Sequence, residues 1–209
     1  MWRVLVINCK SKIYERLCDT VSAALEKTGI EYELVKRNHD QLSDILKSKL
    51  NGIDVVVFSG SSPYEPDFPE VADVANVMKM TLEKEKYAFG VCFGLQMLAH
   101  VLDAEKGKLI EVNSWNKDVE VKVMHDDAIF KGVPDSFITR QYHNLSVPYV
   151  NGQTKLGIGV ILARSRDGIE IMKVGKMYAA QFHPESSKAS EHALKIFENY
   201  FSQINKELS

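Results

Sequence analysis

Apolar and polar residues follow two spacings in turn through the first half of the chain. Continuous apolar runs of about four to eight residues are typical of buried strands, and apolar residues at every third or fourth position are typical of amphipathic helices. The runs predict strands over 3–8, 31–35, 53–58 and 87–91. The helical spacing predicts helices over 13–25, 40–50, 71–84 and 93–102. This alternation predicts an α/β fold with an open, mostly parallel, twisted sheet flanked by helices.

The second half has a different pattern, in which strand-like runs follow one another with tight turns between them. The predicted strands are 119–124, 137–141, 156–163, 169–174 and 178–182. Asp167-Gly168, between two of these runs, is a strong hairpin signal, so we expect added antiparallel strands. The spacing from Ser190 onward predicts a final amphipathic helix. Because the 209 residues contain no repeat and no linker-like segment, we expect one domain over 1–209.

Composition narrows the class of protein. The apolar fraction of 45% and the charged fraction of 26% are ordinary for a globular domain. A net charge of −2 gives no field that would gather nucleic acid. No apolar run approaches the roughly 18 residues of a membrane span, and the N-terminus lacks the features of a signal peptide. With three cysteines in no framework spacing, we expect a cytoplasmic protein that binds neither nucleic acid nor membrane.

The segment from Gly90 to Gln96 carries most of the chemical information. It joins a predicted strand to a predicted helix and places Cys92 between Gly90 and Gly94. Glycine has no Cβ, so the chain can make the sharp strand–helix turn of a nucleophile elbow. The thiol would lie at a helix N-terminus, where exposed N–H groups and the helix dipole favour the thiolate. The pattern therefore predicts that Cys92 is a nucleophile.

A nucleophilic cysteine needs a proton-transfer group within hydrogen-bond reach and a second group that orients it. Among six histidines, His183 is the best placed, because it directly follows the predicted strand 178–182. Reactive groups gather at the carboxyl ends of strands in an open sheet of this type. Glu185 could hold one ring nitrogen of His183 while the other faces Cys92.

The attack of a thiolate on a carbonyl also needs N–H groups that stabilise the oxyanion. Phe93, directly after Cys92, could supply one of them. A second could come from Gly60 or Ser61, which follow the predicted strand 53–58.

Four segments of the chain together resemble the class I, or triad, glutamine amidotransferases. They are the elbow at 90–96, the Gln-Phe-His-Pro-Glu segment at 181–185, Ser59-Gly60 in the place of the oxyanion loop, and 141–145. In the family, the segment that 141–145 resembles holds the substrate glutamine with its backbone. The resemblance spans nearly the whole chain and implies a flavodoxin-like sheet with glutaminase activity.

The resemblance also implies roles for the site residues. Cys92 would attack the side-chain amide of L-glutamine to form a glutamyl thioester, with His183 transferring protons and Glu185 orienting it. Gln96 and the backbone of Asn144 and Leu145 would bind the amino-acid end of the substrate. His143 could equally be a hydrogen-bonded structural residue or part of the site or of a partner interface. We expect no cofactor, and no histidine pair has the spacing of a metal site.

Two segments differ from the usual pattern of the family. Asn8-Cys9-Lys10-Ser11 replaces the signature after the first strand, Asp-Asn-Gly-Gly-Gln or Asp-Asn-Tyr-Asp-Ser. The oxyanion loop reads Gly60-Ser61-Ser62-Pro63 in place of Gly-Gly-Pro or Pro-Gly-Pro. The second difference would alter the oxyanion hole, make activity depend on a partner, or mark a separate branch of the family.

Shorter segments of the chain indicate which synthetase could accept the ammonia, and they point to two different enzymes. Segments 58–60, 129–134 and 161–165 look most like the glutaminase subunit of GMP synthase, an enzyme of purine biosynthesis. Segments 142–145 and 183–186 look more like the small subunit of anthranilate or aminodeoxychorismate synthase.

The chain has no phosphate-binding loop of the Gly-x-x-x-x-Gly-Lys-Ser/Thr type. We therefore expect the ammonia-consuming synthetase to be a separate chain. A stand-alone γ-glutamyl hydrolase or peptidase and a non-catalytic regulatory module are the alternatives. A cysteine-dependent α/β-hydrolase fits less well, because its acid usually precedes the histidine, whereas Glu185 follows His183.

Overall fold

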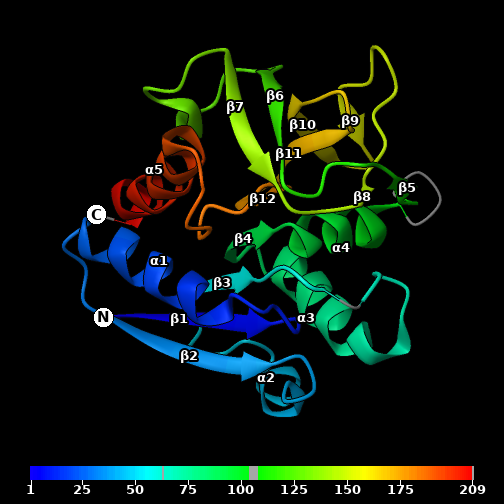
Figure 1. Ribbon diagram of the computed structural model, residues 1–209. Coiled ribbons are helices and arrows are strands. Elements are labelled where there is room, and N and C mark those ends of the chain that lie inside the picture. Colours follow the sequence, from blue (N-terminus) through cyan, green and yellow to red (C-terminus); the bar gives the residue numbers. More distant parts are fainter. Residues whose placement is uncertain (63, 104–107, 209) are drawn as a thin grey trace.

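The computed structural model describes residues 1–62, 64–103 and 108–208, and its centre is a large mixed β-sheet (Figure 1). The strands of this sheet are β1 (Trp2–Asn8), β2 (Tyr32–Asn38), β3 (Val55–Phe58), β4 (Tyr87–Val91), β6 (Lys117–Val123), β7 (Ser136–Gln141), β9 (Lys155–Leu156), β10 (Gly159–Arg164), β11 (Ile169–Val174) and β12 (Met177–Ala180). The helices are α1 (Tyr14–Glu26), α2 (Ser43–Ser48), α3 (Ala72–Glu83), α4 (Phe93–Leu102) and α5 (Glu191–Leu208). The remaining elements are two 3-10 turns, η1 (Pro69–Val71) and η2 (Ala128–Phe130), and the short pair β5 (Ile110–Glu111) and β8 (Leu145–Ser146).

The sheet has a parallel half and an antiparallel half. Its strand order is β2-β1-β3-β4-β12-β11-β10-β6-β7, with β9 paired to β10. Neighbours from β2 to β12 run parallel, and neighbours from β12 to β7 run antiparallel. This confirms the predicted fold class. The strand β12 belongs to both halves, because it lies parallel to β4 and antiparallel to β11.

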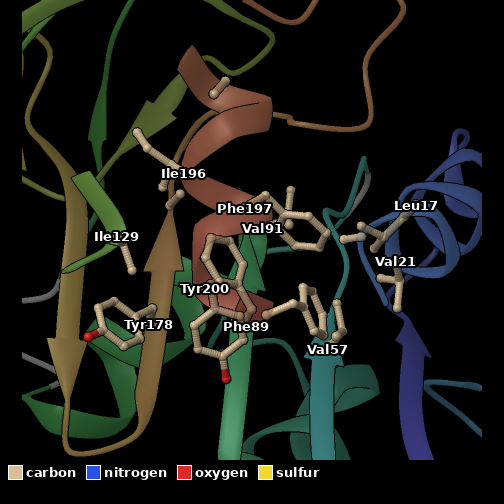
Figure 2. Close-up of a cluster of buried hydrophobic side chains, with 14 of the residues drawn as sticks. Leu17, Val21, Val57, Phe89, Val91, Ile129, Tyr178, Ile196, Phe197 and Tyr200 are labelled. Atoms are coloured by element: carbon tan, nitrogen blue, oxygen red, sulfur yellow. The ribbon is translucent and has the colours of Figure 1, made fainter. Parts of the chain in front are cut away.

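Helices cover both faces of the parallel half and bury the apolar residues of its strands. In β1, Val4 and Val6 belong to the hydrophobic cluster under α1 and α5. Leu5 and Ile7 belong to the opposite cluster, under α2, α3 and α4. Figure 2 shows part of the first cluster, where Phe89 of β4 lies between α1 and α5. The rings of Phe89 and Phe197 meet edge to face with centroids 4.9 Å apart, an arrangement typical of well-packed aromatic pairs.

Several predicted boundaries were wrong, each for a local reason. The helix expected over 40–50 is only Ser43–Ser48, because Lys49 and Leu50 adopt left-handed conformations with φ of 53° and 59°. The strand expected over 156–163 is two antiparallel strands, β9 and β10, with a turn at Gly157, where φ is 56°. The strand expected over 31–35 continues to Asn38, which pairs in register with Asn8.

The strand expected over 178–182 ends at Ala180, so the segment that begins at Gln181 leaves the sheet. The pair formed by β5 and β8 was not predicted at all. In the part of the chain that the structure describes, no helix has the length and apolar character needed to cross a lipid bilayer.

Candidate active site

Cys92 lies between β4 and α4, on the sharp turn that the sequence predicts. Its φ of 53° and ψ of −98° lie outside the regions that residues with side chains normally occupy. Its N–H donates to the carbonyl of Ala180 in β12 at 2.7 Å. A Cβ on Gly90 would lie 2.8 Å from the carbonyl carbon of Gly94, so a side chain there would clash with the first turn of α4. The close approach of strand and helix therefore requires Gly90 and holds Cys92 in its unusual conformation.

His183 and Glu185 follow β12, which pairs directly with β4. The Nδ1 of His183 and the Oε1 of Glu185 are 2.7 Å apart, and the Glu185 side chain is completely buried. Because β4 and β12 are parallel neighbours, their carboxyl ends bring Cys92 and His183 to the same edge of the sheet. The structure thus places the three predicted catalytic residues together.

The surroundings of His183 favour its protonated form. Burial opposes the charge, but the nearby Glu185 and Cys92, through charge and hydrogen bonding, outweigh burial and raise the pKa of His183 well above 6.5. A protonated imidazole beside a sulfur can stabilise a thiolate and can donate a proton to a leaving group.

Gly60 lies against His183 and Cys92. A Cβ at Gly60 would lie 2.8 Å from Cε1 of His183 and 3.6 Å from Cβ of Cys92. Buried Ser59 fixes this loop, since its hydroxyl donates to the Gly60 carbonyl and accepts from the N–H of Cys9, both at 2.8 Å. The loop that differs from the family pattern therefore still reaches the reactive pair, although Pro63 lies outside the described residues.

A cavity of about 590 Å³ opens over Cys92 and His183. Of the predicted site residues, it is lined by Cys92, His183, Gln96, Ser61, Asn144 and Leu145. Gly60, Phe93 and Glu185 do not line it, and all three are buried. A cavity of this size, with a few convergent polar groups, is typical of a small-molecule site.

The predicted substrate-binding segment is tied to α4. The Nε2 of Gln96 donates to the carbonyl of Leu145 at 2.8 Å, and Nδ1 of His143 lies 3.0 Å from the same oxygen. The carbonyl of Asn144 accepts from the N–H of Val112 at 2.7 Å. Both carbonyls therefore already have partners within the protein. The Oε1 of Gln96 has no hydrogen-bond partner among the described residues, so it remains available as an acceptor.

Several contacts of the site were not predicted. The Nε2 of Gln181 lies 3.4 Å from Sγ of Cys92, and the ring of Tyr142 meets the ring of His183 at 6.1 Å. Gln181 belongs to the motif that carries the resemblance, but its neighbours in sequence do not indicate that it reaches the sulfur. Lys12 and Arg16 also line the cavity, and no periodicity marks them. The described residues contain no cluster of three or more potential metal ligands.

Comparison with known proteins agrees with this geometry. The family model described as glutamine amidotransferase class-I matches residues 5–204. The chain is 29% identical over 199 residues to anthranilate synthase component 2 of Archaeoglobus fulgidus, covering 94% of this chain and 96% of that protein. It is 27% identical over 183 residues to the glutamine-hydrolysing GMP synthase subunit of Thermoplasma volcanium, covering 85% and 82%.

The fold is also similar to that of a solved structure, a putative GMP synthase subunit from Thermoplasma acidophilum. The TM-score is 0.72 at 22% identity, with 100% of this chain and 97% of that chain covered. At this identity the likeness concerns the fold, a parallel sheet extended by antiparallel strands. Together with the family match over nearly all residues, it shows that the chain belongs to the class I glutamine amidotransferases and is a glutaminase of that family.

Proposed function

We propose that this chain hydrolyses L-glutamine to glutamate and ammonia through a glutamyl thioester on Cys92. The observation that carries the proposal is that Cys92 and His183 line one cavity, while buried Glu185 contacts the Nδ1 of His183. The thiolate attacks the side-chain carbonyl carbon, and His183 donates its proton to the departing nitrogen. The C–N bond breaks, ammonia leaves and the thioester remains. His183 then takes a proton from water, the hydroxide breaks the C–S bond, and glutamate leaves.

The oxyanion of each tetrahedral intermediate is held by N–H groups on either side of the sulfur. The N–H of Phe93, at the start of α4, has no partner within its own helix. The Gly60–Ser61 loop supplies the second donor, because Gly60 packs against both Cys92 and His183. Loss of one such donor commonly costs about 3 kcal/mol of transition-state stabilisation.

The amino-acid end of glutamine lies against Gln96 and the segment 144–145. The Oε1 of Gln96, to which no described residue donates, accepts from the substrate ammonium group. Because the carbonyls of Asn144 and Leu145 already have partners, we assign their N–H groups and the Asn144 side chain to the substrate carboxylate.

A steady-state glutaminase assay on matched cysteine variants tests this mechanism. Cys92→Ala removes the nucleophile and should lower kcat to background, whereas Cys18→Ala, which removes a buried cysteine of α1 outside the cavity, should retain activity. Circular dichroism and thermal melting show whether both variants fold. Hydrolysis by a folded Cys92→Ala variant at the wild-type rate would exclude the proposal.

We propose further that the ammonia passes to a synthetase on a separate chain, of the GMP synthase type. Support comes from the similarity to the GMP synthase of Thermoplasma volcanium, in which the matching protein is itself named as one subunit. The similarity to anthranilate synthase component 2 supports anthranilate or aminodeoxychorismate synthase as the alternative. Purification of the tagged chain from its native source, with identification of the retained synthetase, distinguishes them.

One observation favours a second candidate, a γ-glutamyl hydrolase or peptidase. Lys12 and Arg16 line the cavity, and no Asp or Glu is among its described lining residues. This charge suits a γ-glutamyl conjugate that carries additional carboxylates. A higher kcat/KM for γ-glutamyl-glutamate than for glutamine would favour this candidate, and a lower value would favour the glutaminase.

A further inference from the structure

A chain of buried polar side chains leads from the cavity wall into the antiparallel half of the sheet. It begins at Gln96, whose Nε2 donates to the Leu145 carbonyl, and continues through His143, whose Nδ1 faces the same carbonyl. The other ring nitrogen, Nε2 of His143, lies 3.1 Å from Oε1 of Gln141 at the end of β7. The Nε2 of Gln141 in turn lies 2.9 Å from Oε2 of Glu170 in β11 and 2.9 Å from Oγ1 of Thr139.

Each of these side chains is almost completely shielded from water. Gln141 and Glu170 are 0% exposed, and Gln96 and His143 are 5% exposed. The other carboxylate oxygen of Glu170 accepts from the Ser165 hydroxyl at 2.7 Å. A buried carboxyl group needs a structural or chemical reason, since its ionised form is costly away from water. The mechanism above uses neither Glu170 nor His143.

The hydrogen atoms in this chain can be assigned by counting donors. The Leu145 carbonyl can only accept, so Nδ1 of His143 carries a proton. If the imidazole is neutral, its Nε2 is then an acceptor and must face the NH₂ group of Gln141, so the amide is turned over, with the positions of its oxygen and nitrogen exchanged. The Gln141 carbonyl oxygen then faces both the Thr139 hydroxyl and Oε2 of Glu170, which lie 2.9 Å from this end of the amide. The Thr139 hydroxyl can donate to it, but the oxygen of Glu170 at this distance is favourable only if the carboxyl group is protonated and donates as well. Neutral Glu170 thus fixes the amide of Gln141, which fixes the tautomer of His143.

In the alternative assignment, His143 is charged and donates to the Leu145 carbonyl and to the Gln141 oxygen, and Glu170 is ionised. Burial opposes this arrangement, since it lowers the pKa of His143 to about 4 and raises the pKa of Glu170 to about 7. The charged groups that act on the pair from neighbouring segments are Asp167, in the turn between β10 and β11, and His183. At pH 6 the neutral arrangement is therefore favoured.

We propose that Glu170 is a positioning residue for substrate binding, which acts through Gln141 and His143 to hold the Leu145 carbonyl next to Gln96. The inference rests on the proposed role of Gln96 and the segment 144–145 in binding glutamine. When Glu170 loses its proton, the Gln141 amide turns its NH₂ group toward the carboxylate. The proton of His143 then moves to Nε2, and Nδ1 no longer donates to the Leu145 carbonyl. Glutamine binding weakens as the pH rises through the pKa of Glu170.

Calorimetric titration with glutamine in a Cys92→Ala background tests this without turnover. With Glu170 present, Kd should rise between about threefold and tenfold from pH 6 to pH 8.5, the effect of one neutral hydrogen bond. Glu170→Gln, which donates an N–H to Gln141 at every pH, should bind as tightly as the parent at pH 6 and lose this rise. Glu170→Ala should bind more weakly at both pH values. The same pH dependence in the parent and in Glu170→Gln would overturn the proposal.

The tautomer of His143 gives a second measurement on the unmodified chain. In ¹⁵N NMR spectra of ring-labelled protein, His143, assigned with a His143→Asn variant, should carry its proton on Nδ1 at pH 6 and on Nε2 at pH 8.5. A tautomer that stays the same would overturn the inference even if no Glu170 variant folds. Failure of the proposed function gives a different result, namely no glutamine binding at any pH together with the expected change of tautomer.

Discussion

At the scale of single residues, the nucleophile and its histidine could be predicted because each belongs to a short local pattern. Cys92 is marked by flanking glycines at a strand–helix junction, and His183 and Glu185 are close in sequence and follow one strand. The contacts of Gln181 with Cys92 and of Glu170 with Gln141 could not be predicted, because each joins residues that are far apart in the sequence and meet only in the folded structure. The catalytic roles themselves stay predictions until variants are measured.

Gln181 offers a test of how the sulfur is stabilised. Its Nε2 lies 3.4 Å from Sγ of Cys92, and its own Oε1 is buried without a hydrogen-bond partner within the described residues. Gln181→Leu removes the donor and should lower kcat/KM about tenfold, as expected for a hydrogen bond to a charged group. Alkylation of Cys92 by iodoacetamide should slow in parallel. Unchanged alkylation in a folded variant would show that Gln181 does not stabilise the thiolate.

The charge of Glu185 controls the proton on His183. Glu185→Gln keeps the shape of the side chain but removes the charge that helps to raise the pKa of His183 above 6.5. The folded-state pKa of His183 should fall, so the imidazolium is lost at lower pH and the alkaline limb of the kcat profile should move to lower pH. We also expect kcat to fall on the order of 10²- to 10⁴-fold. An unmoved alkaline limb would contradict the role of Glu185.

At the scale of elements, alternating periodicity was enough to predict the strands and helices of the parallel half. The errors occurred where the backbone itself ends an element, as at Lys49 and Gly157, whose left-handed conformations no periodicity indicates. The pair β5–β8 is too short to leave a pattern, yet it positions the segment 144–145 at the cavity. Local sequence thus indicates which elements form, but tertiary contacts decide how the short ones pair.

The loop after β3 is one of the two segments in which this chain differs from the family pattern, and it still approaches the site. Gly60→Ala would place a Cβ 2.8 Å from Cε1 of His183 and displace either the loop or the ring. We expect kcat to fall about 10²- to 10³-fold, comparable to the loss of an oxyanion donor.

The matched control for this loop is Gly29→Ala. A Cβ at Gly29 would meet no described atom within 4 Å, but the φ of 73° there is unfavourable for alanine. The change should therefore lower the melting temperature slightly and spare kcat. Equal kcat for both variants would contradict the role of the Gly60 loop.

At the scale of the whole molecule, one mixed sheet carries both the reactive pair and the residues behind the substrate segment. β12 connects the two halves, since it lies beside β4 on one side and β11 on the other. The expectation that residues 1–209 form a single domain stays a prediction. The acceptor of the ammonia could not be derived from the sequence, because a surface that would contact a synthetase needs no local motif.

Transfer of ammonia to a separate chain can be tested on the native complex. Cys92→Ala in the glutaminase chain should abolish glutamine-dependent synthesis by the complex and leave synthesis from added ammonium salt unchanged, because the synthetase site is intact. Wild-type complex, assayed with both nitrogen sources, is the control. Loss of both activities in an intact complex would contradict a purely ammonia-supplying role.

The most direct test of the central claim is capture of the covalent intermediate. Enzyme mixed with labelled glutamine and quenched in acid within milliseconds should carry a glutamyl group on the peptide that contains Cys92, as identified by mass spectrometry. The adduct should be absent from Cys92→Ala and present in Cys18→Ala. A chain that hydrolyses glutamine with no adduct on Cys92, and at an equal rate after Cys92→Ala, would contradict the mechanism.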